Sequence, residues 1–273
     1  MSEAELPYAE VIGDPISHSK SPLIHRFWLD ALGIGGDYRA ARVPPEELGP
    51  YFARRRADPN WRGCNVTIPH KVASLDHVGD PGGVRATIGA INTVFRDQAG
   101  ALVGTNTDAA GFYAPLAGFD LGGEPVVVVG AGGAARAVLF ALARMGVGPV
   151  TIINRNPLKA AALLSSFGLK GRALPLSAPL PAAALLVNAS ALGMASQPPL
   201  ELDLSPLSPG AIVYDLVYAP LETELIARAD ALGFEVVDGL EMLVGQAALA
   251  FELFFGREPP RDRDDELREL LVG

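Results

Sequence analysis

Three short polar stretches of this chain could hold a small ligand and exchange a proton with it. They read GCNVTIPHK (63–71), GAINT (89–93) and GTNTDAAG (104–111), and each places polar side chains beside small residues or proline. We expect each stretch to lie on a loop that follows a strand, because ligands touch the C-terminal ends of parallel strands. Lys71 and Asp108 are the best candidate pair for proton transfer, because none of the 4 histidines stands in an equally suggestive context. A carboxylate beside an ammonium group would hold it in place and favour its charged form.

Every one of these residues also has a purely structural interpretation. Lys71 could be a solvated surface lysine, and Asp108 could cap a helix that begins in NTDAAGF. Asn65 and Asn92 could stabilise turns, and Thr67 could cap the helix after it. The three stretches taken together favour a ligand site over these separate roles.

A fourth stretch, GDPISHSKSPLIH (13–25), follows an apolar run and has two serines before a proline. Ser21 is predicted to be the N-cap of a helix with Pro22 at its first position, because that position needs no backbone N–H donor. This leaves Ser19 unexplained. A helix start can also bind an anion, so Ser19 and Ser21 together could hold a small carboxylate.

Residues 126–136, VVVVGAGGAAR, predict a dinucleotide site of the Rossmann type. A buried strand is followed by a glycine-rich turn and a helix, which is the context that makes such a pattern specific. Gly130 permits the tight turn, Gly132 allows the backbone to approach a pyrophosphate, and Ala135 packs closely on the strand. The predicted cofactor loop consists of Gly130, Ala131, Gly132, Gly133 and Ala134.

The end of the next strand favours NADP over NAD as the cofactor. An NAD site usually has an acidic residue there, whereas this chain has Asn154-Arg155-Asn156. A guanidinium group can bind a 2′-phosphate with two hydrogen bonds, which a carboxylate would repel. The alternative is that Arg155 is an ordinary surface arginine.

The order of strand-like and helix-like segments predicts an α/β protein with two lobes. The first lobe has predicted strands at 8–13, 38–43, 62–67 and 90–96 and helices at 22–32, 45–56, 70–78 and from about 108. The second has continuous apolar strands at 126–130, 150–154, 184–190, 211–217 and 234–238, with helices at about 133–145, 157–167 and 221–232. This alternation is typical of mainly parallel sheets with crossover helices. The apolar helix 240–256 should be buried and return to the first lobe. We therefore expect a substrate domain of 1–108 with 240–273, and a cofactor domain of 109–239.

Composition narrows the class of protein further. The formal net charge is −9, which argues against a nucleic-acid partner, and no apolar run is long enough to span a membrane. A single cysteine and four scattered histidines make a disulfide or a metal site unexpected. The acidic start lacks the features of a signal peptide, so we expect a cytoplasmic enzyme.

Taken in order, GDPISHSKSPLIH, NVTIPHK, GAINT, GTNTDAAGF, GAGGAAR, NRN and GLEMLVGQAALAF resemble the shikimate dehydrogenase family over nearly the whole chain. The resemblance implies NADPH-dependent, reversible reduction of 3-dehydroshikimate to shikimate in aromatic amino-acid biosynthesis. It also implies two α/β lobes with the active site in the cleft between them, in a monomer or homodimer. Lys71 would transfer the proton, paired with Asp108.

The resemblance also assigns the remaining site residues. Ser19 and Ser21 would bind the substrate carboxylate, and Leu216 and Gly239 would lie near the nicotinamide. The ring hydroxyls and the rest of the substrate would be contacted by Asn65, Thr67, Asn92, Asp108, Tyr218 and Gln246. The family usually has threonine where this chain has Asn156, so one hydrogen bond to the 2′-phosphate is in doubt, and many relatives have methionine in place of Leu216. Two rivals remain: a quinate/shikimate dehydrogenase that uses NAD, and a non-catalytic ligand-sensing regulator.

Overall fold

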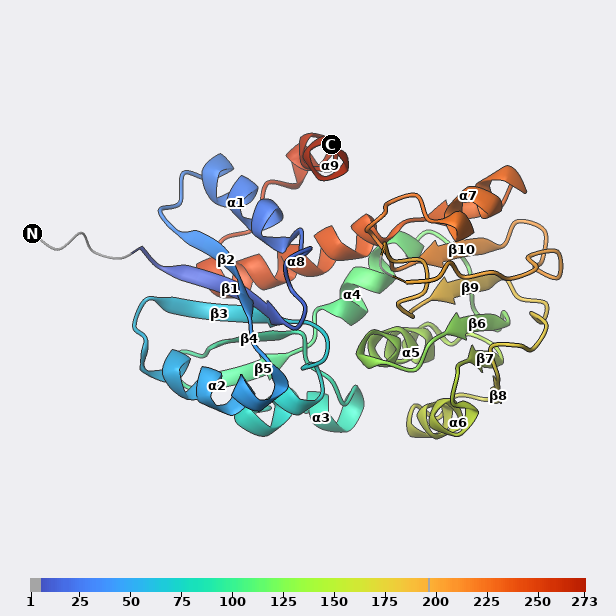
Figure 1. Cartoon of the computed structure of the whole chain (residues 1–273), viewed down its shortest axis with the longest axis horizontal. Helices are drawn as coiled ribbons and strands as arrows, with labels where there is room; N and C mark the ends of the chain where they lie inside the picture. The colour runs from blue at the N-terminus through green and yellow to red at the C-terminus, as the bar shows by residue number, and fades with distance from the viewer. Residues whose placement is uncertain (1–5, 196) are drawn as a thin grey trace, which may run out of the picture. The chain divides into compact units, whose positions relative to one another are not determined.

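The computed structural model describes residues 6–195 and 197–273, which form two compact α/β units. One unit consists of residues 6–107 with Val244–Gly273, and the other of the described residues of Asp108–Leu243. Each unit is built on its own sheet (Figure 1). Within the described ranges, no helix has the length and apolar character needed to cross a bilayer.

The first unit has a five-stranded mixed sheet with the order β2-β1-β3-β4-β5. Strand β1 pairs in parallel with β2 and β3, whereas β4 is antiparallel to both β3 and β5. The strands are β1 (Tyr8–Gly13), β2 (Asp37–Arg42), β3 (Trp61–Val66), β4 (Thr93–Arg96) and β5 (Leu102–Thr105). The α-helices are α1 (Ser21–Ala31), α2 (Leu48–Ala57), α3 (Val84–Thr87) and α9 (Asp264–Val272), with most of α8 (Gly239–Phe255). Short 3-10 turns lie at Pro45–Glu47, Ala73–His77 and Arg261–Arg263.

Strand register separates the two faces of this sheet. Ala9 pairs with Tyr38 and Gly63, so these three positions lie on the same face of the sheet. On this face, Ala250 and Phe254 of α8 pack against Ala9 and Tyr38. A Cβ on Gly63 would lie 2.4 Å from the Phe254 ring, so α8 fits closely only over glycine there. On the other face, the buried Glu10 carboxylate accepts hydrogen bonds from Tyr51 (2.7 Å) and Arg55 (2.7 and 2.8 Å) of α2.

The second unit has a six-stranded sheet, β11-β10-β9-β6-β7-β8, in which every pairing is parallel. Its strands are β6 (Val126–Val129), β7 (Val150–Ile153), β8 (Gly171–Leu174), β9 (Leu185–Asn188), β10 (Ile212–Asp215) and β11 (Glu235–Val237). Its helices are α4 (Asp108–Tyr113), α5 (Gly133–Met145), α6 (Pro157–Ser166) and α7 (Glu224–Ala231), with a 3-10 turn at Ala114–Leu116.

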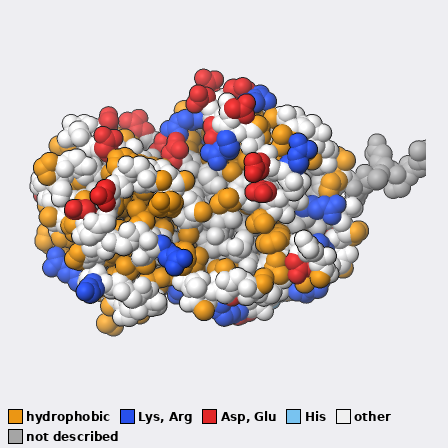
Figure 2. Space-filling model, turned by 180° about the vertical axis from the view of Figure 1, so that it is seen from behind, with side chains coloured by type: hydrophobic (Ala, Val, Ile, Leu, Met, Phe, Trp, Pro, Cys, Tyr) orange, Lys and Arg blue, Asp and Glu red, His pale blue; other side chains and the backbone are white. Residues whose placement is uncertain are grey.

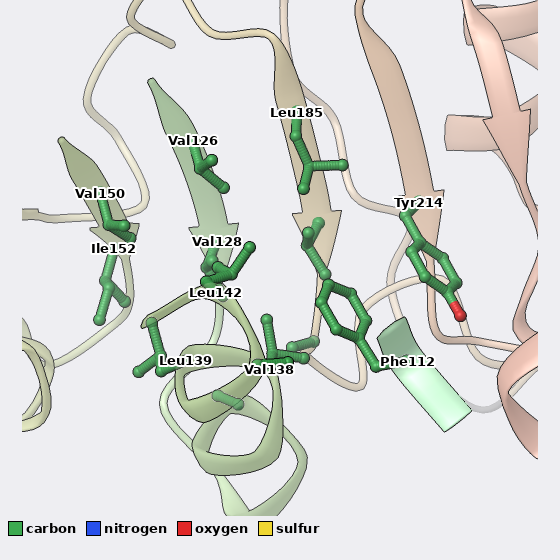
Figure 3. Packing of buried hydrophobic residues seen from close by; sticks show 14 of the residues in the cluster. Phe112, Val126, Val128, Val138, Leu139, Leu142, Val150, Ile152, Leu185 and Tyr214 are labelled. Carbon is green, nitrogen blue, oxygen red and sulfur yellow. The ribbon is translucent and has the colours of Figure 1, made fainter. Parts of the chain in front are cut away.

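Two apolar clusters cover the two faces of this second sheet. On one face, Val138, Leu139 and Leu142 of α5 pack beneath the valines of β6, with the Phe112 ring beside Tyr214 (Figure 3). These two rings are stacked with centroids 5.0 Å apart. On the other face, Leu225 and Ala229 of α7 pack against Val127, Val129 and Val213. Because strands covered on both faces must be apolar throughout, the continuous valine run of β6 is explained.

The predicted fold class is confirmed, with corrections in detail. The helix expected at 70–78 is only a 3-10 turn at Ala73–His77, and the strand expected at 90–96 begins at Thr93. GAINT therefore precedes a strand, not follows one. Strands β5 and β8 were not predicted, since each has four residues and includes a glycine. Helix α9 was also not predicted, and acidic side chains gather over it (Figure 2).

Candidate active site

The predicted polar stretches of the first unit meet at one edge of its sheet. Strands β1, β3 and β5 run in the same direction and end at Gly13, Val66 and Thr105, while the antiparallel β4 begins at Thr93 on that edge. The residues after β1, β3 and β5 and those just before β4 are therefore neighbours. GAINT reaches the site because β4 runs the opposite way.

Backbone hydrogen bonds fix the segment that carries Lys71. The Thr67 N–H donates to the Ile12 carbonyl (2.9 Å), and the Ile91 N–H donates to the Lys71 carbonyl (2.8 Å). His70, between them, is buried, and its Nε2 lies 2.6 Å from the Val43 carbonyl oxygen. The half-buried Lys71 is thus held next to GAINT.

A buried hydrogen-bond network joins the ends of β3, β4 and β5 to α8. The Tyr38 hydroxyl donates to Asn65 Oδ1 at 2.6 Å, and Asn65 Nδ2 donates to the Asn92 carbonyl (3.3 Å) and to Thr93 Oγ1 (3.1 Å). Asn92 Nδ2 in turn donates to Gln246 Oε1 at 3.1 Å. Asn65, Asn92 and Gln246, all predicted substrate contacts, therefore belong to one connected group.

Asn92 is saturated by this network. Its Nδ2 donates to Thr107 Oγ1 (2.8 Å) and to Gln246, and its Oδ1 accepts from the Thr107 N–H (2.7 Å) and the Thr93 hydroxyl (3.1 Å). A side-chain amide offers two donors and two acceptor lone pairs, so all four are used. A direct contact between Asn92 and a ligand would require it to give up one of these bonds.

The predicted capping role of Ser21 is wrong. Helix α1 begins at Ser21 itself, with Lys20 as the N-cap residue and no side-chain capping bond from it. The Ser19 Oγ instead accepts the Ser21 N–H at 3.3 Å, so Ser19 satisfies a donor of the first turn. The helix starts one residue earlier than expected, so Pro22 occupies its second position. Ser21 is buried and Ser19 is half-buried, on the loop that leaves β1.

Asp108 and Tyr218 belong to the second unit. Asp108 is buried at the first position of α4, and Tyr218 is half-buried after β10, where burial raises the pKa of its phenol. The boundary between the units falls between Thr107 and Asp108. The pairing of Lys71 with Asp108 therefore stays a prediction.

The glycine loop lies where the order of strands reverses in the second sheet. The chain moves outward from β6 to β7 and β8, and then returns to place β9 on the other side of β6. Ligands of such sheets bind at this switch point, beyond the carboxyl ends of the strands. Gly130 directly follows β6 there with φ +108°, and a Cβ on it would lie 2.7 Å from the carbonyl oxygen of Ala189, the residue after β9.

The next glycine of the loop has open space instead of a neighbour. A Cβ on Gly132, the N-cap residue of α5, would meet no atom within 4 Å. Ala131, Gly133 and Ala134 complete the turn and lead into α5, whose first N–H groups a pyrophosphate could use. The loop therefore fits a dinucleotide.

Arg155 is exposed just beyond β7, the strand next to β6. Beside it, Asn156 is the N-cap of α6, and its Oδ1 accepts the Lys159 N–H at 3.2 Å. Asn154 Nδ2 donates to the Asn156 carbonyl at 3.0 Å, which closes the turn. The helix thus explains Asn156, and Arg155 is the cationic side chain of this turn.

A buried carboxylate holds the loop that contains Leu216. Asp215 Oδ1 accepts from Asn188 Nδ2 (2.9 Å) and from the Val217 N–H (3.0 Å), and Oδ2 accepts from the Thr223 hydroxyl (2.7 Å). Burial nevertheless raises the pKa of Asp215 above its usual value. A Cβ on Gly239 would lie 2.5 Å from the Val217 carbonyl oxygen, so α8 begins against this loop only with glycine there.

Comparison with known proteins assigns the family. Residues 11–94 match the shikimate dehydrogenase substrate binding domain, residues 116–187 match shikimate/quinate 5-dehydrogenase, and residues 239–264 match the shikimate 5′-dehydrogenase C-terminal domain. The chain is 68% identical over 266 residues, 97% of each chain, to "Shikimate dehydrogenase (NADP(+))" of Sphingopyxis alaskensis. The chain belongs to the shikimate dehydrogenase family. The sequence-based prediction of the family is thereby confirmed.

Solved structures agree with this assignment. Shikimate 5-dehydrogenase from Thermus thermophilus, in complex with NADP(H) and shikimate, is 40% identical, with a TM-score of 0.84 over 97% of this chain and 100% of that one. Quinate dehydrogenase from Corynebacterium glutamicum, in complex with NAD, is 30% identical, with a TM-score of 0.83 over 97% and 99% of the two chains.

Several residues that organise this member of the shikimate dehydrogenase family were missed from the sequence. Thr93 and Thr107 lie inside GAINT and GTNTDAAG, so the motifs contained them without indicating their roles. Asp215 stands in YDLVYAP, and an aspartate at the end of an apolar strand could have indicated a role in organising the site. Tyr38 stands in DYRAAR, where nothing local points to a site.

The open space at Gly132 leads to a first prediction. We expect Gly132→Ala to leave the unliganded protein as stable as the wild type, because its Cβ meets nothing and its φ of −93° suits alanine. The same methyl group should hinder the pyrophosphate and raise the KM for NADP by about tenfold, roughly 1.4 kcal/mol. Thermal melts and initial rates measure both effects, with Gly118→Ala, also in open space, as the control. An unchanged KM for NADP would place the pyrophosphate elsewhere.

Proposed function

We propose that this chain catalyses the reversible, NADPH-dependent reduction of 3-dehydroshikimate to shikimate, a step of aromatic amino-acid biosynthesis. The 68% identity over nearly the whole chain to a shikimate dehydrogenase (NADP(+)) carries this proposal. The predicted activity, enzyme class and cofactor agree with the name of that relative. Consumption of NADPH on addition of 3-dehydroshikimate, with shikimate identified as the product, tests it.

We assign substrate binding to residues 1–108 with 240–273 and cofactor binding to residues 109–239. Ser19 and Ser21 bind the carboxylate of the substrate, which the N–H groups at the start of α1 favour. Lys71 and Asp108 lie at the end of the substrate that reacts. The other contacts, to ring hydroxyls and to the body of the substrate, come from Asn65, Thr67, Asn92, Asp108, Tyr218 and Gln246. Asn65, Asn92 and Gln246 support this assignment by forming one hydrogen-bonded group.

Lys71 supplies the proton. Bound NADPH supplies a hydride, which reduces the ketone carbon. The Lys71 ammonium then gives its proton to the carbonyl oxygen, so that the C=O group becomes a CH–OH group. The neutral amine left on Lys71 recovers a proton from solvent. Asp108 orients the ammonium for the transfer.

The cofactor is held by the loop from Gly130 to Ala134 and by the turn after β7. The loop and the start of α5 bind the pyrophosphate, and Arg155, with Asn154, binds the 2′-phosphate. Leu216 and Gly239 lie beside the nicotinamide. Similarity to quinate dehydrogenase with NAD supports a second candidate, quinate/shikimate oxidation with NAD, but Arg155 stands where an NAD enzyme usually has a carboxylate.

We further propose a cytoplasmic enzyme, monomeric or homodimeric, that acts on a small molecule and binds no nucleic acid. The acidic composition, with a net charge of −9, supports the absence of a nucleic-acid partner. Intact Lys71 and Asp108 favour catalysis over a ligand-sensing role.

The role of Ser19 is open to a direct test. Ser19→Ala removes a hydroxyl group that binds the substrate carboxylate. It should raise the KM for shikimate about fivefold while the KM for NADP stays nearly unchanged. Ser17→Ala, exposed on the same loop, is the matched control. Thermal melts of both variants separate the ligand role from the loss of the bond to the Ser21 N–H. A KM for shikimate equal to that of the wild type would contradict the assignment.

A further inference from the structure

The Tyr38 phenol is buried beneath the proposed substrate site. Tyr38 has 0% of its surface exposed, so it cannot contact a ligand itself. Its ring is stacked on His25 of α1 with centroids 3.9 Å apart and planes within 6°. Phe254 of α8 lies against the same ring at 6.4 Å. Two helices therefore hold the ring of Tyr38 in place.

The hydroxyl of Tyr38 can act only as a neutral hydrogen-bonding group. Burial raises the pKa of this phenol well above its usual value, and hydrogen bonds to Asn65 and Ser21 offset this only in part. Burial likewise lowers the pKa of His25 to about 3, so the ring stacked on Tyr38 is uncharged. The uncharged phenol donates to Asn65 Oδ1 at 2.6 Å.

The orientation of the Asn65 amide follows from its partners. Nδ2 lies 3.3 Å from the Asn92 carbonyl oxygen, which can only accept, so the amide cannot turn round without setting two acceptors against each other. The second N–H of Nδ2 donates to Thr93 Oγ1 at 3.1 Å. Both donors of Asn65 are used inside the protein, and Oδ1 accepts from Tyr38.

We propose that Tyr38 is a positioning residue that, with the Asn92 carbonyl, fixes Asn65 so that it meets the substrate as a hydrogen-bond acceptor. The inference rests on the proposed substrate role of Asn65. It also restricts the chemistry of the ligand. The ligand group that contacts Asn65 must be a hydrogen-bond donor, as a ring hydroxyl is and an ether or ketone oxygen is not. A buried tyrosine 27 positions away in sequence thereby contributes to substrate selectivity.

Tyr38→Phe tests this proposal, because phenylalanine keeps the stacked ring and removes only the hydroxyl. We expect the KM for shikimate to rise about three- to tenfold, while kcat and the KM for NADP change less than twofold. The matched control is Tyr51→Phe: Tyr51 is also buried in the first unit and donates to Glu10 Oε2 at 2.7 Å, on the opposite face of the sheet. Both variants should lose stability, but only Tyr38→Phe should change the KM for shikimate.

A double-mutant cycle separates an effect through Asn65 from a general structural one. Tyr38→Phe should raise the KM in the wild-type background and add little in an Asn65→Ala background. Equal effects in both backgrounds, or an unchanged KM for shikimate, would overturn the proposal. Inactivity of the wild type with shikimate would instead refute the proposed function.

A second variant covers the case in which Tyr38→Phe does not fold. Thr93→Val removes one of the two acceptors of Asn65 Nδ2 and should also raise the KM for shikimate. Thr151→Val, a buried threonine of β7, is its control. Equal KM values for Thr93→Val and the wild type would contradict the fixed orientation of Asn65.

Discussion

Lys71→Ala should lower kcat by roughly a hundredfold or more and change the KM for shikimate much less. Lys71 is used mainly in the transition state, where its proton moves to the developing alkoxide, so its loss affects turnover more than binding. The carbonyl of Lys71 accepts the Ile91 N–H, a backbone contact that alanine keeps. Steady-state kinetics in both directions measure the effect.

Lys170→Ala is the matched control for this variant. It removes the same charge from an exposed position before β8, far along the chain from the polar stretches. The control should keep wild-type kcat. A Lys71→Ala variant with near wild-type kcat would show that another group transfers the proton.

Arg155→Ala should raise the KM for NADP by about ten- to hundredfold and change the KM for NAD little. A hydrogen bond to a charged group contributes about 1.5–3 kcal/mol, which corresponds to that range of affinity. We expect the lower half of the range, because the Asn156 side-chain oxygen is already used to cap α6. NAD lacks the 2′-phosphate, so its KM reports any general damage to the loop.

Arg257→Ala, at another exposed arginine, controls for the loss of one positive charge. It should leave the KM for both cofactors unchanged. Equal effects of Arg155→Ala on NADP and NAD would refute the role of Arg155 as the selector.

Local sequence predicted those parts of the fold that depend on short-range patterns. The helix predicted at 133–145 coincides with α5, because a glycine turn begins it and Gly146 ends it with φ +68°. The valine run of β6 was equally informative, since only a strand covered on both faces has that pattern. The position of the glycine loop at a switch point follows from the order of strands in the sheet, and only the structure shows that order.

Features that depend on tertiary contacts could not be predicted in this way. Ser21 has the residue type and neighbours of an N-cap, yet the chain begins α1 at Ser21 and uses Ser19 as the acceptor. Tyr38 acquires its role only because strand register brings β2 and β3 to either side of β1, with α8 over them. GAINT was predicted to follow a strand, and the antiparallel direction of β4 reversed that order while keeping it at the site.

Initial rates of the wild-type enzyme with shikimate and quinate, each with NADP and with NAD, test the central claim most directly. We expect the highest kcat/KM for shikimate with NADP, because Arg155 favours the 2′-phosphate and the family resemblance points to shikimate. A preference for NAD, or quinate oxidised as efficiently as shikimate, would contradict the account and move this chain to the quinate/shikimate branch of the family.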